Sequence, residues 1–168
     1  MSISMYQASV PVFIRYLGNL RAILEKAAAH AETKKIDPAT FAGSRLYPDM
    51  LPLTRQIQLA SDMAKSAPCR LSGTEPPKFE DTETTFPQLL ERIDKTVAHL
   101  KTFSAGQIDG SEERPVTVNT ARGPITVPGL PYLTQFLLPN FLFHITTAYG
   151  ILRHNGVELG KADYLGTA

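Results

Sequence analysis

Two side chains near the end of the chain, Asn140 and His144, are of types that bind ligands or metals, and they lie four residues apart in a strongly apolar segment. A spacing of four places both side chains on one face of an α-helix. Their neighbours are almost all apolar, so the helix predicted over residues 131–156 is expected to be buried on most sides. A buried amide and a buried imidazole need hydrogen-bond partners, a metal or a ligand. This polar stripe is therefore the strongest candidate for a functional site.

A second helix, predicted over residues 50–67, carries one polar residue on its inward face. Its apolar residues recur at helical spacing, and Gln56 is the polar residue among them. Asp49 lies just before this helix and is expected to cap its N-terminus, with a catalytic carboxylate as the alternative. Tyr149 is expected in the core or an interface, because a tyrosine can bury its ring while its hydroxyl reaches a partner. The predicted inward face is Leu53, Gln56, Ile57, Ala60, Met63 and Ala64, and the residues placed nearer solvent are Arg55, Gln58, Asp62 and Lys65.

Two more helices position this pair. The first is expected to follow a capping box at residues 4–7 and to run to about His30, with Pro11 marking either a kink or its true start. Another capping box begins the third helix at Thr85, whose apolar residues recur as far as about Leu100. These segments show the helical period most clearly.

The connections between the helices complete the predicted fold. Residues 37–48 contain two prolines, a glycine and no apolar period, so we expect an irregular connection there. Residues 114–128 alternate between apolar and polar on either side of a glycine-containing turn, which predicts a small β-hairpin. Four helices joined by modest connections predict an all-α fold, in which residues 1–168 form one antiparallel four-helix bundle with the hairpin between its third and fourth helices.

Composition narrows the class of protein without naming a function. The 17 basic and 16 acidic residues nearly cancel, so nucleic acid is not an expected partner. The single cysteine, Cys69, rules out an internal disulfide and has no activating neighbour in sequence. His99 lies off the apolar face of its helix and is expected to be solvated. No export signal or membrane-spanning segment is recognisable, so we expect a cytoplasmic protein that does not bind membranes.

Three separated motifs resemble a known bacterial family. They are MYQA at residues 5–8, LYPDM at residues 46–50 and HITTAYGILRHNGVELG at residues 144–160. In this order they resemble the domain-of-unknown-function family numbered nineteen ninety-three, which is grouped with the DinB/YfiT-like putative metalloenzymes. The resemblance covers essentially the whole chain. It implies a DinB-like four-helix bundle that commonly forms homodimers, without implying a known reaction.

The resemblance also implies where a metal site would lie. Better-understood members of the superfamily bind a divalent metal, often nickel or zinc, through one histidine on the second helix and a His-x-x-x-His pair on the fourth. Here His144 corresponds to the second histidine of that pair, Asn140 to the first, and Gln56 to the histidine on the second helix. Carboxamide oxygens are weak ligands for nickel and zinc, so His144 is the remaining metal-ligand candidate and needs help from Asp49 or from a bound substrate.

Two functions from different classes remain open. In the first, a pocket lined by Asp49, Gln56, Asn140, His144 and Tyr149 serves a metal-dependent or thiol-dependent small-molecule transferase. In the second, a dimeric, non-catalytic binding or structural protein has kept the bundle and lost the metal site. His144 would then be a neutral imidazole bonded to Asn140 or Gln56 that fixes the register of the helices. The sequence does not name a substrate.

Overall fold

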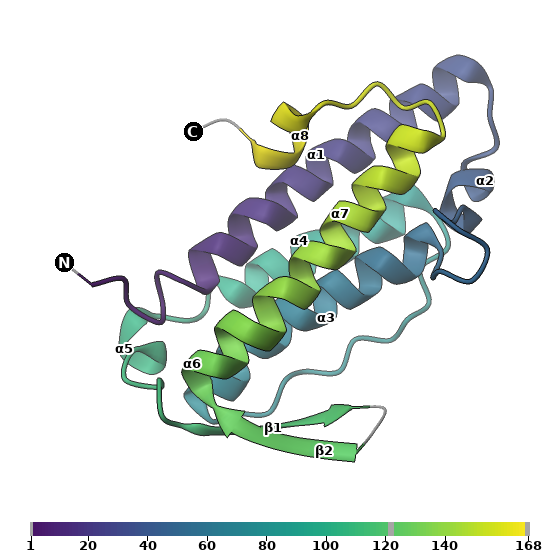
Figure 1. Ribbon diagram of the computed structural model, residues 1–168. Helices are drawn as coiled ribbons and strands as arrows, with labels where there is room; N and C mark the ends of the chain where they lie inside the picture. Colours follow the sequence, from purple (N-terminus) through teal and green to yellow (C-terminus); the bar gives the residue numbers. More distant parts are fainter. Residues whose placement is uncertain (1, 121–122, 167–168) are drawn as a thin grey trace.

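The computed structural model of the chain describes residues 2–120 and 123–166. Among these residues, four long helices pack side by side (Figure 1): α1 (Val10–Lys34), α3 (Leu53–Ser72), α4 (Phe86–Leu100) and α7 (Leu138–His154). Short helices lie in the connections, namely α2 (Pro38–Gly43), α5 (Ala105–Ile108) and α6 (Gly129–Pro131), and another, α8 (Lys161–Leu165), follows α7. The predominantly helical fold with one small sheet agrees with the fold class predicted from sequence. None of the helices in the described ranges has the length and apolar character needed to cross a lipid bilayer.

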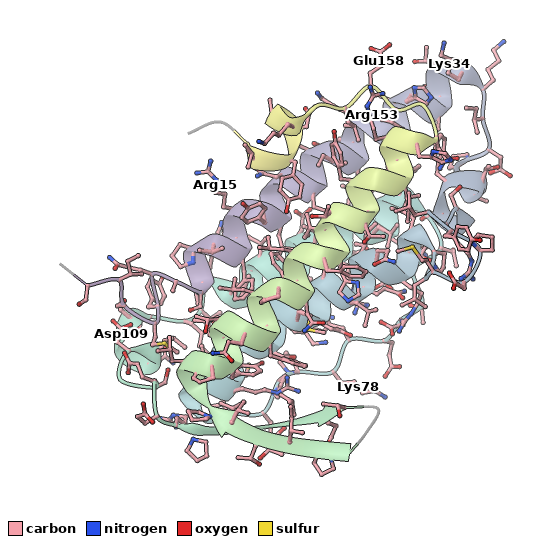
Figure 2. All side chains as sticks on the ribbon, viewed as in Figure 1. Arg15, Lys34, Lys78, Asp109, Arg153 and Glu158 are labelled. Atoms are coloured by element: carbon pink, nitrogen blue, oxygen red, sulfur yellow. The ribbon has the colours of Figure 1, made fainter. Side chains whose placement is uncertain are left out.

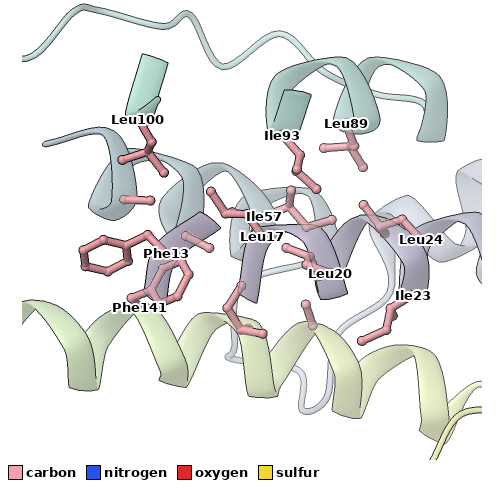
Figure 3. Packing of buried hydrophobic residues seen from close by; sticks show 14 of the residues in the cluster. Phe13, Leu17, Leu20, Ile23, Leu24, Ile57, Leu89, Ile93, Leu100 and Phe141 are labelled. Atoms are coloured by element: carbon pink, nitrogen blue, oxygen red, sulfur yellow. The ribbon is translucent and has the colours of Figure 1, made fainter. Parts of the chain in front are cut away.

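The core forms where the apolar faces of these helices meet. In Figure 3, side chains of α1 point towards those of α4 and α7. Leu17 and Leu20 are fully buried, and the rings of Phe13 and Phe141 meet edge to face with their centroids 4.9 Å apart. This geometry is the one that aromatic pairs prefer. The core therefore fixes α7 against α1 before any polar contact is considered.

Helices α3 and α4 run in the same direction, which differs from the antiparallel arrangement expected. Ser61 lies 2.5 Å from Thr96 and Cys69 lies 3.4 Å from His99, so residue numbers rise together along both helices. The connection over residues 73–85 must therefore return along the bundle (Figure 1). An extended chain of that length reaches about 40 Å, and a 20-residue helix such as α3 is about 30 Å long. The antiparallel prediction for α3 and α4 was wrong because it treated this connection as a short one.

The helix boundaries refine the prediction in three places. Pro11 lies in the first turn of α1, so it marks the start of the helix and not a kink. Residues 37–48, expected to be irregular, contain α2, whose first turn is capped by the side chain of Asp37. α3 does not stop before Pro68 but continues to Ser72. The last turn of the helix is almost entirely buried, and its packing outweighs the loss of the backbone hydrogen bond that Pro68 cannot donate.

The hairpin is confirmed. Strands β1 (Pro115–Thr120) and β2 (Gly123–Pro128) pair antiparallel, with Val116 opposite Val127. Val116 and Val118 are buried against the helices, which gives this two-stranded sheet the support that it lacks alone. The tip of the predicted turn, residues 121–122, lies outside the described residues.

The predicted fourth helix begins in a different helical form. The stretch η1 (Tyr132–Leu137) is π-helical and leads directly into α7, with Pro139 in the first turn of α7. A proline cannot donate the backbone hydrogen bond of a continuous α-helix, and the change of register from π to α occurs at this point. The predicted end is confirmed: α7 stops at His154, and Gly156 adopts a φ of 89°.

Two glycine substitutions test this packing. A Cβ on Gly129 would lie 2.1 Å from the backbone oxygen of Ser111, so we expect Gly129→Ala to lower the free energy of unfolding by about 1 to 3 kcal/mol. Gly18 lies within α1 with nothing within 4 Å of an added Cβ, so Gly18→Ala should raise it by about 0.5 to 1 kcal/mol. Urea unfolding of both variants measures the difference. Equal effects of the two substitutions would contradict the described packing around Gly129.

Candidate functional site

Gln56 and His144 meet between α3 and α7. Nδ1 of His144 lies 2.7 Å from Oε1 of Gln56. The two helices run antiparallel here, since Arg70 near the end of α3 reaches Tyr132 before the start of α7 at 3.3 Å. Gln56 is 2% exposed and His144 is 9% exposed. The structure thus brings together the two residues that the sequence placed on facing helices.

The hydrogen bonds fix which ring nitrogen of His144 carries the proton. Nε2 of Gln56 donates to the backbone oxygen of Leu51 at 3.1 Å, so Oε1 of the same amide faces the imidazole. An amide oxygen only accepts hydrogen bonds, and Nδ1 must therefore be the donor. In the neutral ring this leaves a lone pair on Nε2. Nε2 has no hydrogen-bond partner among the described residues and is not one of their fully buried unpartnered atoms, so it remains reachable from solvent.

Burial keeps this imidazole neutral. Loss of solvent around the ring lowers the pKa of His144 below its ordinary value, because the charged form is disfavoured in an apolar environment. The ring of Phe143 lies edge to face against it, with 5.4 Å between centroids. A neutral histidine with a free Nε2 can accept a proton or a hydrogen bond.

Exposed apolar side chains lie beside His144 and in the connection before α3. Phe143 is 55% exposed and neighbours His144 on α7. Leu51, whose backbone oxygen holds Gln56, is itself exposed. Leu46 belongs to the same connection and lies over α7, with its methyl groups 3.8 Å from where a Cβ on Gly150 would be. Isolated exposed apolar residues are common, but several in one connection and on the helix that it lies over form a surface suited to an apolar ligand or a partner.

Asn140 and Asp49 do not join the Gln56–His144 pair. The side chain of Asn140 donates through Nδ2 to the backbone oxygen of Phe136 in its own helical segment, at 2.5 Å. Asp49 is exposed in the connection before α3 and makes no hydrogen bond or ion pair with the described residues. It does not cap α3 either, because Pro52 occupies the N-cap position. The expected capping role of Asp49 is therefore wrong.

Tyr149 faces a different neighbour. Its ring packs against Tyr164 of α8, with 6.1 Å between the centroids. Together with Thr146, Lys161 and Tyr164 it lines a separate hollow of about 240 Å³. The structure places Tyr149 half-buried beside α8 and does not bring it to Gln56, which faces His144 from α3.

The donors at His144 do not fit a nickel or zinc centre. Oε1 of Gln56 already accepts the hydrogen bond from His144, and Nδ2 of Asn140 is bonded to its own helix. Within the described ranges, no three residues of the types His, Cys, Asp and Glu are grouped closely enough to hold a metal ion. One imidazole nitrogen and one carboxamide oxygen fall short of the imidazole and thiolate ligands that these metals favour.

Sequence reasoning missed a buried ionic cluster on the other side of α3. The guanidinium of Arg92 is 1% exposed and lies within 3.1 Å of carboxylate oxygens of Asp62, Asp81 and Glu83. Lys65 pairs with Asp62 and is also buried. The placement of Lys65 and Gln58 near solvent is therefore corrected, whereas Asp62 is partly exposed as predicted. The signal was present, since Arg92 lies at helical spacing from two buried residues of α4, Leu89 and Thr96.

A second missed contact joins Cys69 to His99. Nε2 of His99 lies 3.4 Å from Sγ of Cys69 and 3.3 Å from the backbone oxygen of Lys65, so His99 is not simply solvated. Burial raises the pKa of the Cys69 thiol, which stays protonated and unreactive. This contact belongs to the packing of α3 against α4.

Comparison with known proteins agrees with the resemblance seen in the sequence. The structure is similar to that of a DinB family member protein from Shewanella denitrificans, with 42% sequence identity, a TM-score of 0.89, and coverage of 97% of this chain and 92% of that chain. The family described as Domain of unknown function (DUF1993) matches residues 5–165, so the chain belongs to this family. No curated protein matched the chain.

The lowered pKa of His144 predicts a loss of stability in weak acid. Because the folded-state pKa lies below the unfolded value of about 6.5, the unfolded chain binds more protons between the two values. The free energy of unfolding should therefore have its highest value above about pH 6.5 and decrease as the pH falls from there to the folded-state pKa. Urea unfolding at pH 7 and pH 5 measures it. His144→Gln should remove this part of the dependence, whereas His154→Gln, at an exposed position, should keep it.

Glu83 does not interfere in that range. Burial raises the pKa of its carboxyl, but hydrogen bonds from Arg92 and Gln58 outweigh burial and leave the pKa below its ordinary value. Its contribution is present above the unfolded value of about 4.3 and is lost only at lower pH. An identical change between pH 7 and pH 5 in the wild type and in His144→Gln would contradict the assignment to His144.

Proposed function

We propose that the protein binds a small molecule at His144 and that this imidazole acts there as a general base. One observation carries the proposal: the Gln56 amide holds Nδ1 as a hydrogen-bond donor and leaves Nε2 with a free lone pair. A base must be unprotonated and correctly oriented before it can accept a proton. Both conditions follow from the packing of α3 against α7.

The chemistry we propose is transfer of a group to or from a thiol. Nε2 of His144 accepts the proton from the sulfur of a bound thiol, and the electron pair of the S–H bond stays on the sulfur. The sulfur then forms a bond to the transferred group of a second substrate, while the bond from that group to its leaving group breaks. The leaving group departs with that electron pair and takes the proton back from Nε2. The hydrogen bond from Nδ1 to Gln56 is kept in the resulting imidazolium, because Nδ1 is a donor in both states. The exposed ring of Phe143, which lies against the His144 ring, would contact the apolar part of the second substrate. No step of this chemistry uses a metal.

We further propose the DinB/YfiT-like four-helix arrangement, a cytoplasmic location and a homodimer. The exposed apolar residues of the connection before α3 support the dimer, since apolar side chains gathered at the surface mark an interaction surface: Leu46, Tyr47 and Leu51. The same patch supports a second candidate function, a non-catalytic dimeric protein in which Gln56 and His144 only fix the register of α3 and α7. A single substitution distinguishes the two candidates.

We expect small thiols to bind at His144. Glutathione and cysteine should shift the NMR signals of the His144 ring in a saturable way, whereas S-methylcysteine, which has no S–H proton, should shift them much less. The same thiols should shift the signals of the neighbouring Phe143 ring, and in His144→Gln that response should disappear while the free energy of unfolding changes by less than about 1 kcal/mol, because glutamine can still bond to Gln56. No saturable thiol response in the wild type would contradict the catalytic candidate and support the structural one.

A further inference from the structure

The connection over residues 74–85, here called the strap, lies along the groove between α3 and α4 in an extended conformation. Thr74 bonds to Cys69, Phe79 lies beside Lys65, and Asp81 pairs with Arg55. The strap therefore runs antiparallel to α3. The strap contains no helix or strand, and Figure 2 shows Lys78 at its outer edge, with an 85% exposed side chain.

Three alternate residues in the middle of the strap are anchored. Phe79, Asp81 and Glu83 contact the helices. The side chains of Lys78 and Glu80, which flank Phe79, pair with each other near solvent. Alternation of this kind is how an extended peptide presents one side to a groove. The helices hold the strap as they would hold a bound peptide.

The attachment is ionic more than apolar. The strap carries four carboxylates and one ammonium group. The groove faces it with a set of four cations and one carboxylate: Arg55, Lys65, Arg92, Lys95 and Asp62. Phe79 is the one large apolar side chain of the strap, and its ring has Lys95 Nζ 4.1 Å and Lys65 Nζ 4.7 Å from its centroid. Ammonium groups at these distances are attracted to the ring face.

The strap does not satisfy the groove completely. Nε of Arg92 is buried and has no hydrogen-bond partner among the described residues, although both terminal nitrogens of the guanidinium are bonded. A hollow of about 380 Å³ beside the strap is also lined by Arg92, together with Lys78, Phe79 and Lys95. A buried donor without a partner shows that the strap does not satisfy every polar group of the groove, so a segment that bonds to this donor would compete with the strap.

We propose that the groove between α3 and α4 is a docking site for an extended acidic segment of a partner protein, of the pattern Phe-x-Asp-x-Glu, and that the strap occupies it in cis. The partner segment and the strap compete for Arg92 and for the cations around Phe79. This site is separate from His144, which belongs to α7 and contacts the opposite side of α3. Charge complementarity and the spacing of Phe79, Asp81 and Glu83 define the partner's chemistry.

The test uses a labelled peptide with the strap sequence, TEPPKFEDTETT, and the full-length chain. Phe79→Ala loosens the strap without leaving a buried charge unpaired, and Lys78→Ala is the matched control at an exposed position. Loss of the cation–π contacts should open the strap roughly tenfold more often, and the apparent dissociation constant of the peptide should fall roughly tenfold in Phe79→Ala relative to Lys78→Ala. A peptide carrying Asp81→Asn and Glu83→Gln should bind at least roughly tenfold more weakly, because its two charge pairs are gone.

Hydrogen exchange gives a second readout that does not depend on the peptide. Amides of residues 74–85 should exchange roughly tenfold faster in Phe79→Ala than in Lys78→Ala, while those of α1 and α7 exchange equally in both. Exchange of the strap only together with the whole bundle would overturn the proposal. So would equal binding of the acidic and the neutralised peptides, or no binding to Phe79→Ala at millimolar peptide.

Discussion

The hydrogen bond between Gln56 and His144 is the contact on which the candidate site depends. α7 is so apolar that an imidazole on its buried face must find a partner, and α3 supplies one at 2.7 Å. The amide is itself oriented by the backbone oxygen of Leu51, so the connection before α3 determines which atom of Gln56 faces the ring. The protonation of His144 is therefore decided outside the helix that carries it. Disrupting that connection would change the chemistry of the imidazole without touching it.

A topological constraint shapes the opposite side of α3. Because α3 and α4 run in the same direction, the chain must return along the whole bundle between them. The returning segment has few apolar side chains, so ion pairs and not apolar packing hold it in place. The buried guanidinium of Arg92 pairs with carboxylates of α3 and of the strap. Buried ion pairs are costly to desolvate and contribute specificity more than net stability. The two faces of α3 are thus different in kind, one a neutral polar contact with α7 and the other a charged groove with α4.

The helical periods predicted Gln56 and His144 on facing helices, because each lies at regular spacing among apolar neighbours. They did not predict that Asn140 would bond to its own helix, since a side chain near a proline can satisfy itself with a carbonyl of the preceding turn as easily as across the interface. Arg92 and Lys65 were misjudged because burial of a long charged side chain depends on partners distant in sequence, here Asp81 and Phe79. The direction of α4 could not be predicted from helix periods, because it depends on where the strap runs.

The tautomer of His144 tests the account most directly. A long-range ¹H–¹⁵N correlation spectrum of the protein at pH 7, assigned by comparison with His144→Gln, reports which ring nitrogen carries the proton. The account predicts a neutral ring with the proton on Nδ1 and a bare Nε2. A ring protonated on Nε2 alone, or on both nitrogens at pH 7, would contradict it, because the Gln56 amide would then not control the imidazole and His144 could not act as the proposed base.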